Sequence, residues 1–302
     1  MKAITAAKSF LYDSYWKAAR LLPDEWYVRM VYKRQTGKVL HLNPPRTFNE
    51  KIQWLKLHDR RPIYTIFADK LAVRKHIEST LGGQYLIPLL GIWDRVEDID
   101  FELLPKQFVL KATHDSGSVL LCRDKSEFDI HGARSRLRES LRQNFYWVGG
   151  EWAYKDVKPR IIAEAYLSDS GRIVPEDYKL YCFDGEPRLI VVFHNRFSTT
   201  EALCESVYDL EWNQQPCTLD DHFQIAMTPQ ERPGCLEELI RLSRKLCKGF
   251  PHMRTDFYVV GGRIYFGEIT LYTANGFQPM IPSEYDEILG SWITLPSKAK
   301  SI

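Results

Sequence analysis

Two acidic residues near the C-terminus stand where two β runs would meet. The stretch "MRTDFYVVGGRIYFGEIT", residues 253–270, carries Asp256 and Glu268 on either side of Gly261 and Gly262. A glycine pair between β runs is typical of a hairpin turn. Pairing of the two runs would let Asp256 and Glu268 approach each other across the ladder, where like charges destabilise a sheet unless a cation lies between them.

Two interpretations of this acidic pair stay open at this point. Mg²⁺ takes one or two carboxylates and completes its octahedron with water and substrate phosphates, so a shared Mg²⁺ would relieve the repulsion. Alternatively, both acids point to solvent or form ordinary ion pairs with the nearby Arg254 and Arg263. The hairpin alone does not separate these interpretations.

A second group of polar residues lies upstream in "QFVLKATHDSGSVLL", residues 107–121. Lys111 falls on a β run that leads into a polar loop with Ser116, Gly117 and Ser118, and a second β run follows. Backbone N–H groups of such a loop can hold phosphate oxygens, and a lysine on the strand adds a fixed positive charge. An Asp-Ser-Gly turn also occurs in ordinary hairpins, so the loop by itself is a weak signal.

A third group begins in "RIIAEAYL", residues 160–167, an apolar run that contains Glu164. Its backbone could meet the edge of an adenine ring while apolar side chains enclose the base; alternatively it is a core strand that ends in a surface acid. In the following "EDYKLYCF", Asp177 and Lys179 are two positions apart and therefore share one face of a strand.

The elements that must position these residues change in character along the chain. Up to about residue 85 the patterns are mainly helical: in "TFNEKIQWLKLHD", Thr47 has the N-cap position of a capping box with Glu50. The stretch "YTIFADKLAVRKHIEST" predicts a second amphipathic helix that begins near Ala68, carries Lys70 and ends before Gly82. From residue 86 onward short β runs follow one another.

Turn signals and two helical patterns divide the β-rich part. Asp184-Gly185 and Gly261-Gly262 predict hairpins, and helices are expected at 133–143 and 235–248. The result is a mixed, largely antiparallel sheet with flanking helices, which is an α+β fold.

Composition limits the classes of function. With 302 residues, 44% hydrophobic content and a formal net charge of +2, the chain is typical of globular proteins and has no general attraction for nucleic acid or membranes. Charged residues interrupt the N-terminal segment before a signal or spanning length is reached, so we expect a cytoplasmic protein without a membrane span. The six cysteines lack C-x-x-C or zinc-like spacing, which predicts separate, reduced thiols.

Taken in order, these groups resemble the ATP-grasp superfamily. Blocks such as "FNEKIQWLKLHDRRPIYTIFADKLAVR", "FVLKATHDSG", "EWAYKDVKPRIIAEAYL", "DYKLYCFDGEPRLI" and "RTDFYVVGGRIYFGEIT" are similar to the TupA-like ATP-grasp family, over about residues 47–295. The resemblance implies two β-rich subdomains that hold ATP between them. We therefore expect a helical region at 1–85, a small subdomain with the phosphate loop at 86–165, and a C-terminal subdomain with the metal site at 166–302.

The resemblance also implies a role for each matching residue. The ATP phosphates would contact Lys70, Lys111 and the loop formed by Asp115, Ser116, Gly117 and Ser118. Adenine would lie against the segment Glu164, Ala165, Tyr166 and Leu167. Asp177 would bind the ribose hydroxyls. Asp256 and Glu268 match the family's Mg²⁺ carboxylates. Thr270 stands where an Asn is usual as third ligand, so weak binding by Thr270, a water, or Asn275 from "TANG" would complete the set. Arg254 and Arg196 would neutralise the transferred phosphoryl group.

The reaction implied is ATP-dependent ligation of a carboxylate to an amine through an acyl phosphate. By resemblance, the setting is bacterial cell-surface polysaccharide synthesis, with a uronic acid or amino acid as the carboxylate and transient contact with lipid-linked polysaccharide machinery. A helical region as short as 1–85 cannot supply the α/β domain that binds substrate in many ATP-grasp enzymes, so the acceptor site is not carried over.

Three other functions remain open. Asp98-Ile99-Asp100 has the D-x-D pattern of metal-dependent nucleotide-sugar glycosyltransferases. An ATP-grasp kinase acting on a saccharide hydroxyl would need a general base, for which His114 or His194 is available. A nucleotide-binding protein without turnover is the third, although Lys111, Asp256 and Glu268 together favour catalysis.

Overall fold

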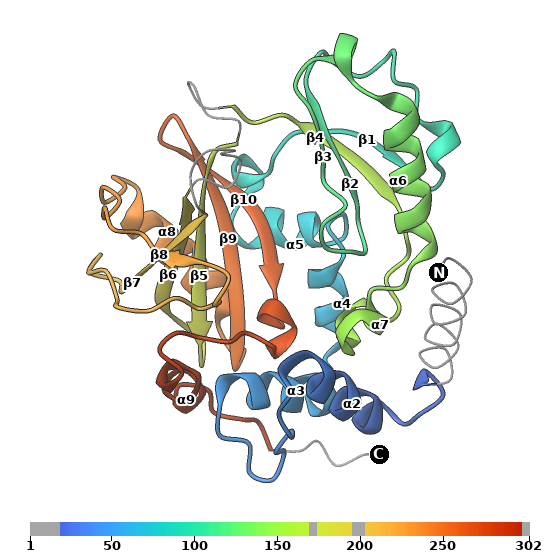
Figure 1. The fold of residues 1–302 in the computed structure, drawn as a ribbon. Coiled ribbons are helices and arrows are strands. Elements are labelled where there is room, and N and C mark those ends of the chain that lie inside the picture. The colour runs from blue at the N-terminus through green and yellow to red at the C-terminus, as the bar shows by residue number, and fades with distance from the viewer. Residues whose placement is uncertain (1–18, 169–173, 195–202, 298–302) are drawn as a thin grey trace, which may run out of the picture.

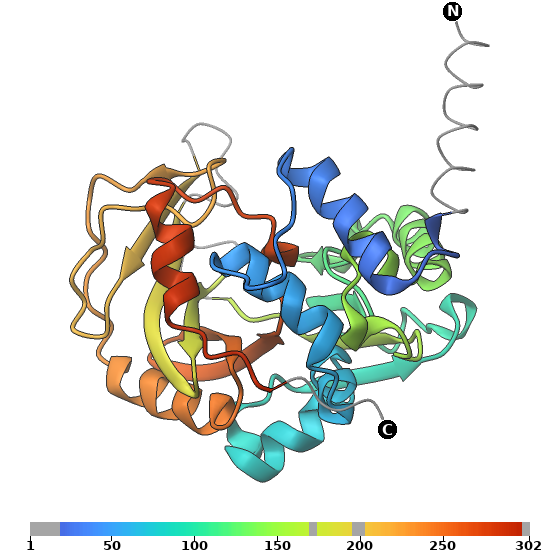
Figure 2. The ribbon, with the colours of Figure 1, turned by 90° about the horizontal axis from the view of Figure 1, so that it is seen from below.

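The protein is built around two β-sheets, as a computed structural model that describes residues 19–168, 174–194 and 203–297 shows. In Figure 1 the six-stranded sheet is on the left and the four-stranded sheet on the right, with α4 (Pro62–Ala68) and α5 (Val73–Thr80) between them. The helices α2 (Asp24–Thr36) and α3 (Phe48–His58) lie beneath both, and Figure 2 shows α3 crossing the middle of the molecule. Mixed sheets and helices confirm the predicted α+β class.

The capping of α3 confirms the N-terminal sequence pattern. Thr47 Oγ1 accepts a hydrogen bond from Glu50 N (3.2 Å), and the Glu50 carboxylate accepts one from Thr47 N (3.2 Å), which is a complete capping box. Phe48, Ile52 and Leu55 then face the core. The capping therefore fixes where the helix under the two sheets begins.

The single helix expected from Ala68 to Gly82 is wrong. The chain forms α4 and α5 with a break between them, because Asp69 Oδ1 accepts hydrogen bonds from Leu71 N (2.8 Å) and Ala72 N (3.2 Å) and holds a turn there, before α5 begins at Val73. Lys70 consequently lies in the turn rather than on a helix, and its N–H donates to Thr113 O (3.0 Å). This bond brings Lys70 beside the end of the strand that carries Lys111.

The smaller sheet has the order β1-β4-β2-β3 and is antiparallel throughout. Its strands are β1 (Leu89–Trp93), β2 (Phe108–Ala112), β3 (Leu120–Cys122) and β4 (Ile161–Ala165). The helix α6 (Ile130–Arg142) covers one face, where Leu137 and Ala133 pack on Phe108, Leu110 and Ile161. The short elements η2 (Val96–Asp98), η3 (Lys125–Glu127), α7 (Tyr146–Gly149) and η4 (Trp152–Tyr154) complete this half.

The larger sheet has the order β10-β9-β5-β6-β7-β8. It comprises β5 (Glu176–Phe183), β6 (Glu186–His194), β7 (Cys204–Tyr208), β8 (Gln224–Ile225), β9 (His252–Val260) and β10 (Arg263–Thr270), and only β7 and β8 pair in parallel. One face is covered by α8 (Leu236–Cys247), whose Ser243 lies between Cys182 and Thr255. After β10 the chain continues through η5 (Thr273–Gly276) and α9 (Glu284–Ser291). The short element η1 (Gly83–Tyr85) lies earlier, between α5 and β1.

Both predicted hairpins are confirmed. Asp184 and Gly185 join β5 to β6 with φ of 51° and 82°, and Gly261 and Gly262 join β9 to β10 with φ of 55° and 78°. Two consecutive residues with positive φ are what a type I′ turn requires.

All six cysteines are free. The domain limits at 85/86 and 165/166 remain predictions.

No helix in the described part of the chain is long and apolar enough to cross a membrane.

Candidate active site

Asp256 and Glu268 face each other across the β9–β10 ladder. They are direct cross-strand partners, next to a bulge between Phe266 and Glu268. Gly267 forms this bulge, and a Cβ at Gly267 would lie only 3.0 Å from the carbonyl oxygen of Asp256. The extra residue re-aims Glu268 toward the face that carries Asp256.

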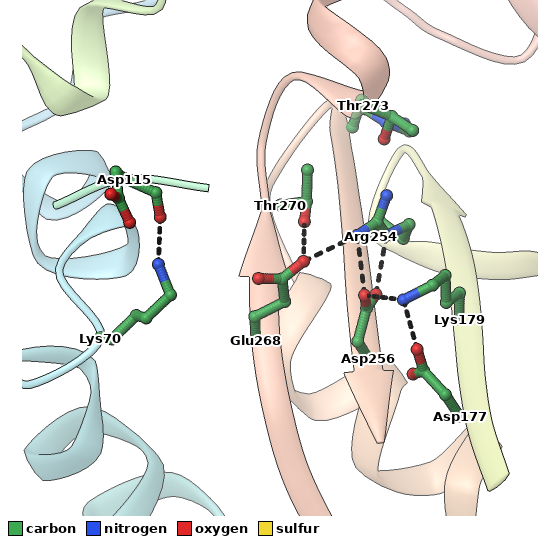
Figure 3. A network of polar contacts seen from close by, with 10 residues as sticks. Lys70, Asp115, Asp177, Lys179, Arg254, Asp256, Glu268, Thr270 and Thr273 are labelled. Atoms are coloured by element: carbon green, nitrogen blue, oxygen red, sulfur yellow. Dashed lines mark hydrogen bonds and ion pairs between the residues drawn. The ribbon is translucent and has the colours of Figure 1, made fainter. Parts of the chain in front are cut away.

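The cation between the two acids is the guanidinium of Arg254 (Figure 3). Arg254 Nε and Nη2 each donate to Asp256 at 2.7 Å, and Nη2 also donates to Glu268 Oε1 at 2.8 Å. Thr270 Oγ1 donates to the same Glu268 oxygen at 3.2 Å. The third nitrogen, Nη1, makes no hydrogen bond to the described residues and points away from both acids toward Thr273 (Figure 3).

Lys179 extends this network to Asp177. Its Nζ lies 2.6 Å from Asp256 Oδ2 and 2.7 Å from Asp177 Oδ2, which confirms that Asp177 and Lys179 share a face of β5. Burial disfavours the charged form of Asp256, but Arg254 and Lys179 outweigh it and hold the Asp256 pKa below its usual value. Burial likewise opposes the charge on Lys179, and Asp177 and Asp256 raise its pKa nonetheless. The ion pairs therefore favour the charged forms of Asp256 and Lys179 despite their burial.

A polar pocket opens between this network and the smaller sheet. It is lined by Lys70, Arg74, Lys111, Ser116, Gly117, Val119, Glu164, Asp177, Lys179, Asp256, Tyr258, Phe266, Gly267 and Glu268. Most of the residues singled out from the sequence thus come together, although they derive from five separate segments. Burial lowers the pKa of Lys70, while the nearby Glu268 and Asp115 act in the opposite direction.

Glu164 is held by two cations inside this pocket. Lys111 Nζ lies 2.7 Å from Glu164 Oε2, and Arg74 Nη1 lies 2.8 Å from Glu164 Oε1. Glu164 is therefore not a surface acid at the end of a core strand, and it is only 7% exposed. Arg74, on α5, was not identified from the sequence, because nothing local relates it to a residue ninety positions away on β4.

The loop at Asp115 to Ser118 has an anchored base and an exposed tip. The Asp115 carboxylate accepts hydrogen bonds from Ser118 Oγ and Ser140 Oγ, and Asp115 O accepts one from Lys70 Nζ. Ser118 Oγ in turn accepts one from Ala112 N (3.1 Å). Ser116 and Gly117 are exposed, and Gly117 has a φ of 97°, which favours glycine. The tip can therefore turn its N–H groups toward the polar pocket.

An apolar pocket adjoins the polar one. It is lined by Ile87, Val109, Lys111, Val119, Leu121, Glu164, Ala165, Tyr166, Leu167, Val174, Pro175 and Tyr258. Lys111, Val119, Glu164 and Tyr258 line both pockets, so the two form one continuous site. Tyr258 is a further lining residue that the motifs alone did not identify; alternation along β9 from Asp256 would have found it, since positions 256 and 258 share a face.

The other candidate metal-ligating and catalytic residues that the structure describes do not line either of the two pockets. Asn275 Oδ1 lies against Gly149, where an added Cβ would be 1.8 Å away, so this side chain does not reach toward Glu268. Asp98 and Asp100 are exposed and border a separate hollow with Arg134. His114 is buried with Nε2 3.1 Å from Ser140 O, and His194 Nε2 lies 2.9 Å from Ser206 Oγ. Arg196 lies outside the described residues.

Several solved structures resemble this chain at low sequence identity. The crystal structure of a D-alanine–D-alanine ligase from Bacillus anthracis complexed with ATP is 19% identical, with a TM-score of 0.40 over 76% of this chain and 59% of the ligase. An N5-carboxyaminoimidazole synthetase from Staphylococcus aureus complexed with ADP is 14% identical, with a TM-score of 0.41 over 76% of this chain and 53% of the synthetase. The chain thus spans less than two thirds of either protein. No match was found among curated proteins.

The family assignment rests on a family model rather than on these distant structures. The model for the TupA-like ATP-grasp family matches residues 50–294, which include every described residue of the two pockets. This match confirms the resemblance drawn from the sequence motifs and the ATP-grasp fold that it implied. The chain belongs to the TupA-like ATP-grasp family.

Proposed function

We propose that this protein is an ATP-dependent carboxylate–amine ligase. The observation that carries the proposal is the continuity of an apolar pocket with a pocket of lysines, an exposed glycine loop and paired carboxylates. An apolar slot suits a purine ring, and lysines with backbone N–H groups suit a triphosphate. Residues far apart in the chain converge on one site of this character, and the family assignment supports the same ligand.

Adenine would enter the apolar pocket between Val109, Leu121 and Leu167. The N–H of Ala165 is already bonded to Pro88 O (2.9 Å), so backbone hydrogen bonds to the base would come from Tyr166 and Leu167, beyond the end of β4. Asp177, which lines the polar pocket, is the candidate for the ribose hydroxyls. Lys70, Lys111 and the loop tip at Ser116 and Gly117 would then hold the phosphates.

The residues beside the phosphate positions fit Mg²⁺. Asp256 and Glu268 supply two carboxylates and Thr270 a hydroxyl, an all-oxygen donor set of the kind that Mg²⁺ takes. The Glu268 side chain is 44% exposed and borders the polar pocket, so it is accessible from the phosphate side. When bound, Mg²⁺ would supply charge stabilisation for the phosphate oxygens.

Two steps complete the proposed reaction. A carboxylate oxygen of the substrate attacks the γ-phosphorus of ATP, the bond from that phosphorus to the β–γ bridging oxygen breaks, and ADP leaves, which gives an acyl phosphate. An amine nitrogen then attacks the acyl carbon, the bond from this carbon to the phosphate oxygen breaks, and inorganic phosphate leaves while the nitrogen loses a proton. Lys70, Lys111 and Arg254 would stabilise the charge on the transferred group, with Arg254 Nη1 as the donor left over from the acidic pair.

The substrate classes proposed here are those that the resemblance to the family implies, and they do not come from the geometry of the pockets. We propose a uronic acid or an amino acid as the carboxylate and an amino group as its partner, in bacterial cell-surface polysaccharide synthesis. A kinase acting on a hydroxyl is less well supported, because His114 and His194 are both engaged with other groups. A glycosyltransferase centred on Asp98 and Asp100 is less well supported because these residues lie apart from the continuous site.

The test is ADP release from Mg-ATP with hydroxylamine present, over a panel of uronic acids, sugar-nucleotide uronates and amino acids. A ligase forms a hydroxamate with one class of carboxylate and releases ADP in step with it. ADP release without hydroxamate from any carboxylate would favour the kinase instead. Absence of ATP turnover throughout the panel would contradict both and direct attention to UDP-sugars.

A further inference from the structure

The loop that would hold the ATP phosphates is not supported at its tip. Ser116 and Gly117 are exposed, and neither makes a hydrogen bond to any residue that the structure describes. Gly117 borders the polar pocket and also a second hollow, which it shares with Arg136 and Gln143 at α6. Because the tip adjoins open space in both hollows, its position depends on how the base of the loop is held.

One carboxylate at the base joins the loop to two other segments. Asp115 Oδ1 accepts a hydrogen bond from Ser118 Oγ, which ties the two ends of the loop together. Asp115 Oδ2 accepts one from Ser140 Oγ on α6, and Lys70 Nζ donates to the backbone oxygen of the same aspartate (Figure 3). Asp115 is 8% exposed and Ser140 is 7% exposed, so both side chains are shielded from bulk water.

The hydroxyl of Ser118 is engaged entirely within this base. It donates its proton to Asp115, and its oxygen accepts a hydrogen bond from Ala112 N (3.1 Å) at the end of β2. A hydroxyl has a single O–H donor, so Ser118 has no proton left for a phosphate oxygen. The side chain of Ser118 therefore shapes the loop, and the phosphates would be bound by the backbone N–H groups of the tip.

Ser140 connects this base to a fixed part of the fold. Leu137, one turn earlier on α6, is completely buried against the smaller sheet, and residues three apart share a face of a helix. The backbone oxygen of Ser140 lies 3.1 Å from Nε2 of His114, the residue before Asp115. The backbone and the side chain of Ser140 thus hold two consecutive residues at the start of the loop.

We propose that Ser140 is a positioning residue for ATP, which acts through the Asp115 carboxylate to aim the N–H groups of Ser116 and Gly117 at the phosphates. The proposal rests on the nucleotide site described above and adds a residue that lines neither nucleotide pocket. Ser140 does not touch the nucleotide. Its effect is confined to the phosphates, because adenine and ribose would bind to other segments of the chain.

The test compares Mg-ATP with adenosine in Ser140→Ala, because adenosine fills the apolar pocket without any phosphate. The substitution should raise the Kd of Mg-ATP about fivefold to twentyfold, since the lost hydrogen bond reaches the phosphates through the loop. The Kd of adenosine should stay within about twofold. Calorimetry measures Mg-ATP directly and adenosine by competition with it. Ser140→Thr keeps the hydroxyl and should bind Mg-ATP within about threefold of the wild type.

Ser243→Ala is the matched control. Ser243 is also a buried serine on a helix that covers a sheet, and its hydroxyl lies 2.6 Å from Thr255 Oγ1 and 3.1 Å from Cys182 Sγ. Loss of these contacts should lower the melting temperature and leave the Kd values of Mg-ATP and adenosine unchanged. A buried hydrogen bond that serves stability alone would give this result at Ser140 as well.

An unchanged Kd of Mg-ATP in Ser140→Ala, or equal rises for Mg-ATP and adenosine, would overturn the inference. If Ser140→Ala does not fold, Ser140→Cys serves instead, because a thiol of similar size is only a weak donor; a Kd of Mg-ATP equal to that of the wild type would again overturn it. Both affinities are measured without a carboxylate substrate. A wild-type protein that binds Mg-ATP but forms no hydroxamate would therefore refute the ligase function, while the Kd comparison still decides the role of Ser140.

Discussion

Asp256 on β9 and Glu268 on β10 are direct cross-strand partners, and one arginine bonds both. The repulsion expected from their positions is thus relieved in the protein by Arg254. The two interpretations left open by the sequence are complementary: the ion pair with Arg254 is formed, and the same oxygens remain the natural ligands for the Mg²⁺ that we propose to accompany ATP.

Asp256→Asn should abolish most ATP turnover. The substitution removes a proposed Mg²⁺ ligand and leaves Arg254 and Lys179 without their shared carboxylate, so we expect a loss of at least about a hundredfold in kcat. ADP release measures it, with circular dichroism to establish folding. Asp100→Asn is the control, and it should be as active as the wild type. Full turnover in Asp256→Asn, or a greater loss in Asp100→Asn, would show that the metal and phosphoryl site is misplaced.

Lys111→Met should weaken ATP binding with little effect on folding. Lys111 borders both pockets, and its partner Glu164 retains the ion pair with Arg74 in the variant. Loss of one charge-assisted contact to phosphate predicts a rise in Kd of about tenfold to fiftyfold, measured by calorimetry. Lys158→Met removes an exposed lysine paired with Asp94 and should leave Kd unchanged. Equal Kd values in all three proteins would remove Lys111 from the nucleotide site.

The sequence predicts those parts of the site whose residues lie close together along the chain. The β9–β10 hairpin follows from local signals, the alternation of side chains and the Gly261-Gly262 turn, and both the pairing and the position of Asp256 are confirmed. The break before α5 was missed because the side chain of Asp69 competes with the helix for backbone N–H groups. This local competition is weaker as a sequence signal than the apolar periodicity on either side of it.

The contacts that complete the site are non-local, and no sequence pattern contains them. Arg74 reaches Glu164 across ninety residues, and Lys56 meets Asn275 across more than two hundred. These partners come together only because α4 and α5 lie between the two sheets and α3 lies beneath them (Figures 1 and 2). Family resemblance supplied Lys70 and the adenine segment, whereas Arg74 required the folded structure.

Gly267→Ala should lower turnover more than it lowers stability. A Cβ at this bulge would lie 3.0 Å from Asp256 O and 3.3 Å from the Tyr258 ring, so the strand must shift at the position that aims Glu268. We expect a loss of about tenfold in kcat, in line with the sensitivity of catalysis to small displacements. Gly262→Ala is the matched control: its φ of 78° makes alanine strained by about 1 kcal/mol, but no atom lies within 4 Å of the added Cβ. It should lower the melting temperature and leave kcat intact. The opposite pattern would deny the bulge a role in aiming Glu268.

The buried Glu205 should make stability fall as pH rises toward neutrality. Burial raises the pKa of Glu205 to about 7, from an unfolded value near 4.5. Between these values the folded protein binds more protons than the unfolded chain, so the contribution of Glu205 is fully present below pH 4.5 and is lost as pH rises through 7. Glu205→Gln removes this dependence and should be more stable than the wild type by about 3 kcal/mol at pH 8, with a much smaller difference at pH 4.5. Because Gln keeps an oxygen for Leu219 N, the hydrogen bond survives the change. Urea unfolding of both proteins at the two pH values measures the difference, and a gap that is the same at pH 4.5 and pH 8 would mean that folding does not raise the pKa of Glu205.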